Sequence, residues 1–137
     1  AQPGQDDSGP VPASTMGPAI NWGEIVNPGS SAVEAGVVVY SRENELLGRE
    51  DIAIPAHSQH HVYLNQFLGE QNVGFFRVSS RDESPLLVQS LFYGSNAEGK
   101  VDWSYGSQAK GSAASFVSLV VPVNTFLGAA NWLNEIW

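Results

Sequence analysis

Hydrophobic residues recur at every second position in several short stretches of the chain, which is the period of a β-strand with one buried face. Val33–Tyr40 is the clearest stretch, because it begins with this alternation and is rich in β-branched residues. No stretch keeps a 3.6-residue period, and only Gln66–Glu70 is expected to form a helical turn. The predicted strands are Ile20–Val26, Val33–Tyr40, Asp51–Ile54, Gln59–Asn65, Val73–Ser79, Pro85–Tyr93, Lys100–Tyr105, Phe116–Val121 and Ala130–Trp137.

This spacing of about nine short strands predicts an all-β fold, an antiparallel β-sandwich of the Ig-like or jelly-roll-like kind. The first 18 residues hold four prolines and three glycines and almost no bulky apolar side chain. We therefore expect residues 1–18 to be a flexible or extended N-terminal arm outside the core. Residues 19–137 are expected to form the sandwich domain.

The charge balance limits the kinds of partner that the chain is expected to bind. Six basic residues face fourteen acidic ones, for a net charge of −8. Nucleic-acid binding and attraction to an anionic membrane both need clustered Lys and Arg, so neither partner is expected. The apolar runs are too short for membrane insertion. The opening Ala1-Gln2-Pro3 is typical of a chain after signal-peptide removal, so we expect an extracellular or cell-surface location.

One short motif occurs twice. Asn21-Trp22 recurs as Asn131-Trp132 at an offset of 110, and Glu-Ile follows in both places. The offset is about the length of one sandwich domain. Three interpretations stay open: the domain is one unit of a tandem array, its last strand enters a neighbouring subunit, or both strands lie side by side in one sandwich.

The end of the chain is very apolar, and we expect residues 130–137 to be a donated strand or the entry strand of a repeat. The expected subunit interface consists of Asn131, Trp132, Leu133, Ile136 and Trp137.

An ordered string of short segments carries a resemblance to a known class of domain. The segments are Asn21-Trp22, Ile25–Pro28, Val37–Tyr40, Ile54–Ala56, Tyr63–Asn65, Phe76–Val78 and Leu91–Gly94. Between Ala19 and about Trp103 the chain looks like the β-sandwich repeats, each about 100 residues long, of secreted bacterial surface proteins. In style of sequence it is also similar to surface-fibre subunits that assemble by strand donation. The resemblance implies a structural or adhesive role and transfers no catalytic residue.

Candidate chemistry is sparse. His57, His60 and His61 are the only cluster of metal-ligand type, and a strand would point His60 and His61 to opposite faces. We expect a polar turn there, with no metal and no cofactor. The motifs of α/β-hydrolases, phosphate-binding loops and zinc proteases are missing from the sequence, so no enzymatic activity is expected.

Aromatic residues suggest a rival function. Tyr93, Trp103 and Tyr105 are a candidate platform for stacking against sugar rings, with Trp103 and Tyr105 on one face of a strand. The same alternation is also explained if Val101, Trp103 and Tyr105 point into the core.

The sequence thus predicts a structural subunit of an extracellular bacterial filament or matrix, which binds copies of itself by β-strand exchange. The alternative is a carbohydrate-binding or adhesive module of a larger secreted protein.

Overall fold

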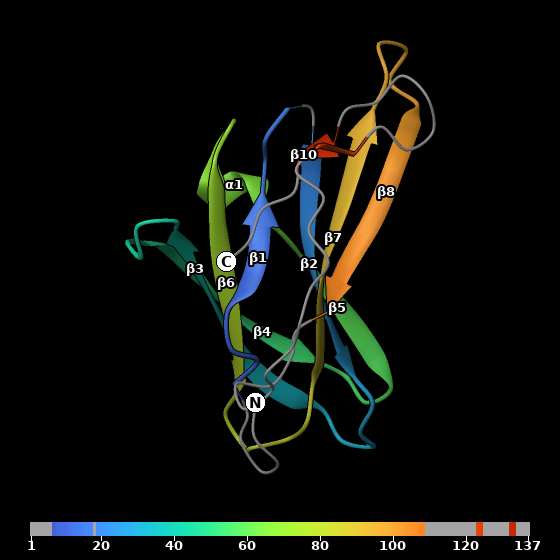
Figure 1. Cartoon of the computed structure of the whole chain (residues 1–137). Coiled ribbons are helices and arrows are strands. Elements are labelled where there is room, and N and C mark those ends of the chain that lie inside the picture. Colours follow the sequence, from blue (N-terminus) through green and yellow to red (C-terminus); the bar gives the residue numbers. More distant parts are fainter. Residues whose placement is uncertain (1–6, 18, 109–122, 125–131, 134–137) are drawn as a thin grey trace.

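The computed structural model describes residues 7–17, 19–108, 123–124 and 132–133. Two four-stranded antiparallel sheets pack face to face, in the strand orders β1-β6-β3-β4 and β5-β2-β7-β8 (Figure 1). The strands of the sandwich are β1 (Val11–Ser14), β2 (Ala19–Asn27), β3 (Val33–Ser41), β4 (Leu46–Ile54), β5 (Ser58–Tyr63), β6 (Val73–Ser80), β7 (Leu87–Ser95) and β8 (Val101–Gln108). The predicted all-β sandwich is confirmed.

Alternation explains why these strands form. In β3 the buried positions are Val33, Ala35, Val37 and Val39, and the residues between them point away from the core. The core joins the inner faces of both sheets around the fully buried ring of Phe76. Its other members include Val11, Ile25, Ile54, Val62, Leu64 and Val78.

The helical turn predicted at Gln66–Glu70 is a short helix, α1 (Asn65–Leu68), between β5 and β6. Strand β4 begins at Leu46, five residues before the predicted start at Asp51, and its early residues are exposed. Its first five residues, 46–50, lie at the edge of the sheet and none is buried, so apolar and polar residues do not alternate there.

One expectation about the N-terminal arm is wrong. Val11–Ser14 is indeed extended, but it pairs with β6 as strand β1, and Val11 and Ala13 belong to the core. Two prolines hide the pattern, because Pro12 lacks an amide proton and disfavours a strand. It is tolerated because β1 is an edge strand.

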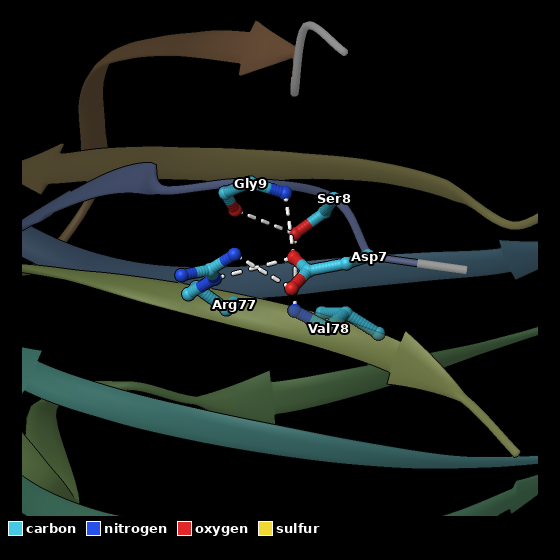
Figure 2. Close-up of polar contacts among 5 residues, drawn as sticks. All are labelled: Asp7, Ser8, Gly9, Arg77 and Val78. Atoms are coloured by element: carbon cyan, nitrogen blue, oxygen red, sulfur yellow. Dashed lines mark hydrogen bonds and ion pairs between the residues drawn. The ribbon is translucent and has the colours of Figure 1, made fainter. Parts of the chain in front are cut away.

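Residues 7–9 extend this attachment (Figure 2). The Ser8 amide donates to the Val78 carbonyl at 2.9 Å, and the Val78 amide donates to Ser8 Oγ at 3.0 Å. The Arg77 guanidinium binds both carboxylate oxygens of Asp7, at 2.6 and 3.2 Å. The described part of the N-terminal segment is thus fastened along β6.

A separate two-stranded pair, β9 (Val123–Asn124) and β10 (Trp132–Leu133), is antiparallel, with Trp132 opposite Asn124. The strand predicted at Phe116–Val121 lies outside the described residues, as does most of the one at Ala130–Trp137.

Candidate functional site

The start of β2 holds a buried amide that ties the two sheets together. Asn21 is fully buried, and its Oδ1 accepts the backbone amide of Ser14, in the opposite sheet, at 2.9 Å. Its Nδ2 donates to Ser90 Oγ at 2.7 Å and to the Leu91 carbonyl at 3.0 Å, both on β7. Both donor hydrogens and the carbonyl oxygen of this side chain are therefore bonded to residues on other strands.

The backbone amide and carbonyl of Asn21 are also hydrogen-bonded. Its amide donates to Asn65 Oδ1 at 2.8 Å, and its carbonyl accepts the Leu64 amide at 3.0 Å. Asn65 also donates through Nδ2 to the Ala19 carbonyl at 3.0 Å. The beginning of β2 is thereby fastened to the turn that starts α1.

Thr15 fixes the crossing from β1 to β2. Its hydroxyl donates to the Gly69 carbonyl at 2.7 Å and accepts the Asn72 amide at 3.1 Å. The Thr15 amide donates to the Asn72 carbonyl at 2.8 Å. We call the groups that receive Thr15 and Asn21 the entry slot, which comprises Leu64, Asn65, Gly69, Asn72, Ser90 and Leu91.

A second buried amide closes the other end of β2. Asn27 donates through Nδ2 to the carbonyls of Ile54 and Pro55, at 3.1 and 3.0 Å. Its Oδ1 accepts the Gly29 amide at 2.9 Å. Because a shift of one residue would place these amides on the wrong face, Asn21 and Asn27 together specify the register of β2.

The solvent side of the β5-β2-β7-β8 sheet carries a group of aromatic and aliphatic side chains. Trp22 on β2 lies opposite Tyr63 on β5, with ring centroids 4.9 Å apart and planes inclined by 44°. Ile20 pairs with Tyr93 on the other side of β2, and Ile20 and Tyr63 are 39% and 38% exposed. We call Ile20, Trp22, Tyr63 and Tyr93 the outer aromatic face.

A polar row borders this face. His61 Nε2 lies 2.7 Å from Glu24 Oε2, and Gln89 Nε2 donates to Glu24 Oε1. The side chain of Glu24 is only 14% exposed, whereas that of His61 is 42% exposed. The hydrogen bonds from Gln89 and His61 lower the pKa of Glu24 below its ordinary value of 4.5, although burial acts in the opposite direction. Glu24 is therefore an anchored carboxylate between two strands.

The histidines do not converge. His57 is an exposed turn residue with φ of +52°, His60 lies 3.6 Å from Glu50 on β4, and His61 binds Glu24. Among the residues that the structure describes, no three His, Asp or Glu side chains gather as a metal site. No helix in this part of the chain is long and apolar enough to cross a membrane.

The structure separates the aromatic residues of the predicted sugar platform. Trp103 pairs with Gly94, which is buried, and Tyr93 pairs with Ser104, so Tyr93 and Trp103 lie on opposite faces. Tyr105 is opposite Phe92 in the backbone register. Tyr93 instead lies opposite Ile20 in the register of β2 and β7, a neighbour that sequence reasoning overlooked because strand pairing brings the two residues together.

Of the predicted subunit interface, only Trp132 and Leu133 lie within the described residues, in β10. Asn131, Ile136 and Trp137 lie outside them. The two Asn-Trp motifs do not pair with each other in the described strands, since β10 pairs with β9, and β2 pairs with β5 and β7.

Comparisons with known proteins bear on the fold. No protein-family model and no curated protein matches the chain. Among solved structures it is similar to the Anabaena sensory rhodopsin transducer, at 16% identity and a TM-score of 0.50, over 61% of this chain and 91% of that one. It is also similar to Thermotoga maritima 1070, at 12% identity and a TM-score of 0.57, over 81% of this chain and 93% of that one. The chain therefore shares an all-β domain fold with these two proteins.

Proposed function

We propose that this chain is a non-catalytic structural subunit of an extracellular bacterial surface filament or matrix, joined to copies of itself through its terminal strand. One observation carries the proposal. The entry slot receives an Asn-Trp segment followed by Glu-Ile, and the same residue types recur in the same order at Asn131-Trp132 and Glu135-Ile136.

The chemistry of the slot explains why the order matters. An asparagine is needed to satisfy Ser14, Ser90 and Leu91, and an isoleucine to fill the core as Ile25 does. Docking of residues 130–137 in a neighbouring copy would supply both, with Ile136 buried in the core as Ile25 is. Each large apolar side chain contributes roughly 1.5–3 kcal/mol when fully buried.

Since β2 of the same chain already fills the slot, strand exchange replaces one entry strand by another. The gain must then come from the larger apolar side chains of the terminal segment.

Sedimentation velocity and negative-stain electron microscopy test the proposal. The full chain should form large species or filaments, and a chain without residues 130–137 should remain monomeric. The matched control is Leu87→Ser, which removes an exposed apolar side chain from β7 and should leave assembly intact. Monomers in the full chain would overturn the proposal, and so would assembly that persists in the truncated chain.

A second candidate function, glycan binding, rests on the outer aromatic face. Aromatic rings stack on the C–H faces of sugars, and the neighbouring Glu24, His61 and Gln89 offer donors and acceptors for hydroxyl groups. A polysaccharide chain would lie across β5, β2 and β7.

Affinity electrophoresis against soluble β-glucan, xylan and mannan tests this candidate. Trp22→Ala should weaken binding at least tenfold, whereas Val101→Ala, at an exposed position on β8, should not change it. Equal retardation of both variants, or none with any polysaccharide, would exclude the outer aromatic face as a glycan site.

A further inference from the structure

The internal repeat is longer than its Asn-Trp motif. Residues 8–22 align without a gap with residues 118–132 at the offset of 110. Seven of the 15 positions are identical: Ser8 and Ser118, Val11 and Val121, Pro12 and Pro122, Thr15 and Thr125, Ala19 and Ala129, Asn21 and Asn131, Trp22 and Trp132.

The repeated residues are those that the first copy needs for its own packing. Ser8, Val11, Thr15, Ala19 and Asn21 are all buried. The three polar ones each bind the backbone of another segment: Ser8 binds Val78, Thr15 binds Gly69 and Asn72, and Asn21 binds Leu91. The residues that recur in the second segment are therefore mostly those that are buried or hydrogen-bonded in the first.

The described part of the second segment has strands at the aligned positions, although these strands pair differently from β1 and β2. Val123–Asn124, which is β9, aligns with Ala13–Ser14 in β1, and Trp132–Leu133, which is β10, aligns with Trp22–Gly23 in β2. The strands β5, β6 and β7 of this chain already pair with β1 and β2. β9 and β10 pair with each other instead.

We infer that residues 118–137 are the β1–β2 entry of a second sandwich of the same kind, so that the partner of this segment is a copy of residues 28–108. In that copy Thr125 takes the place of Thr15 against the Gly69–Asn72 loop, and Asn131 takes the place of Asn21 between β7 and α1. Trp132 lies on its outer face. This inference rests on the proposed joining of like sandwiches and names the strands that meet.

The two segments differ in the spacing of their last shared residues. The second segment has one more residue between Trp and Glu than the first, because Glu24 follows Trp22 by two positions and Glu135 follows Trp132 by three. An extra residue in a strand is accommodated as a β-bulge. Glu135-Ile136 then takes the place of Glu24-Ile25.

A fused chain tests the inference directly. Residues 27–120 of this sequence are appended after Trp137 of the full chain, which supplies a second set of β3–β8 but no second copy of residues 1–26. We expect hydrogen exchange and limited proteolysis to show that the appended residues are protected. Their exchange and cleavage rates should be within tenfold of those of the first unit. Asn131→Ala should increase proteolysis of the appended unit at least tenfold and leave the first unit unchanged, and Asn21→Ala should do the reverse.

The matched control is the same fusion with residues 118–137 in scrambled order, which should leave the appended residues unprotected. Two outcomes would overturn the inference. The appended residues could be degraded in the fusion with the native segment, or they could be protected equally well in the fusion with the scrambled segment. This outcome is distinct from failure of the proposed function: a fusion that folds as two units while the full chain stays monomeric supports tandem sandwiches in one chain and rejects exchange between chains. Filaments of the full chain with an unfolded appended unit would reject this inference alone.

Discussion

The indole of Trp103 on β8 lies directly over Gly94 on β7. A β-carbon placed on Gly94 would fall 1.9 Å from Cε2 and 2.1 Å from Nε1 of the ring. The two residues are paired in the backbone register, and the pairing shifts immediately after Gly94, where β7 and β8 have an irregularity. Because Gly94 has no side chain, the indole of Trp103 can pack against the backbone of β7, where it is half-buried.

Gly94→Ala should therefore destabilise the domain by about 1–3 kcal/mol, because the indole has to move out of the volume that the methyl group takes. Urea unfolding followed by circular dichroism measures the loss. Gly36→Ala is the control, since its β-carbon would lie 3.6 Å from Asp51 Oδ1, which is an ordinary contact. Equal stability of the two variants would show that the indole can leave Gly94 at no cost.

Asn21→Ala should lower the free energy of unfolding by about 3 kcal/mol, because it leaves the Ser14 amide and the Leu91 carbonyl without their partner. Ser90→Ala removes only one of the bonds to Asn21 and should cost about 1 kcal/mol. Gln66→Ala, at an exposed position of α1, should change stability by less than about 0.5 kcal/mol. A loss for Asn21→Ala no larger than that for Ser90→Ala would contradict the cross-sheet role of this amide.

Much of the architecture could be predicted from the sequence. Strands β2, β3, β6 and β7 follow from local alternation, and the all-β class follows from their number and spacing. β1 is not evident from the sequence, because its two buried side chains, Val11 and Ala13, alternate with Pro12 and Ser14 over only four residues.

The site was less predictable, since it depends on pairing between distant segments. Trp22 and Tyr63 are neighbours only because β5 lies beside β2. Glu24 gains its two partners from β5 and β7, 37 and 65 positions away. The separation of Tyr93 from Trp103 is decided by the register of β7 against β8, which no local pattern reveals.

Acid should weaken the fold through Glu24. Because folding lowers the pKa of this carboxyl, its contribution to stability is present above pH 4.5, the ordinary value, and is lost as the pH falls through the lower value in the folded state. Unfolding midpoints in urea, measured between pH 7 and pH 3, should fall less steeply in Glu24→Gln than in the parent chain. Glu43→Gln, at an exposed position in the β3–β4 turn, is the control and should keep the parent slope. Parallel curves for all three proteins would show that Glu24 gains nothing from Gln89 and His61.

Asp7→Ala should detach the N-terminal segment locally while changing global stability by less than about 1 kcal/mol, because the Asp7–Arg77 pair is partly exposed to water. Amide hydrogen exchange is expected to rise at Ser8 and Val78, whose amides link the segment to β6, and to stay unchanged at Val37 in the centre of β3. Added salt should produce part of the same effect in the parent chain. Unchanged exchange at Ser8 would show that the backbone bonds hold the segment without the ion pair.

The direction of the strands has a mechanical consequence for the proposed joining of like units in series. β1 runs opposite to β2 in Figure 1, and β8 runs parallel to β2 because each is antiparallel to β7. The start of β1 and the end of β8 therefore lie toward the same end of the sandwich. Tension applied between these two points would peel β1 from β6 one hydrogen bond after another, beginning at Asp7 and Ser8, rather than load all the bonds at once. Such a unit would yield at low force and lengthen, so that a series of them would behave as an extensible tether.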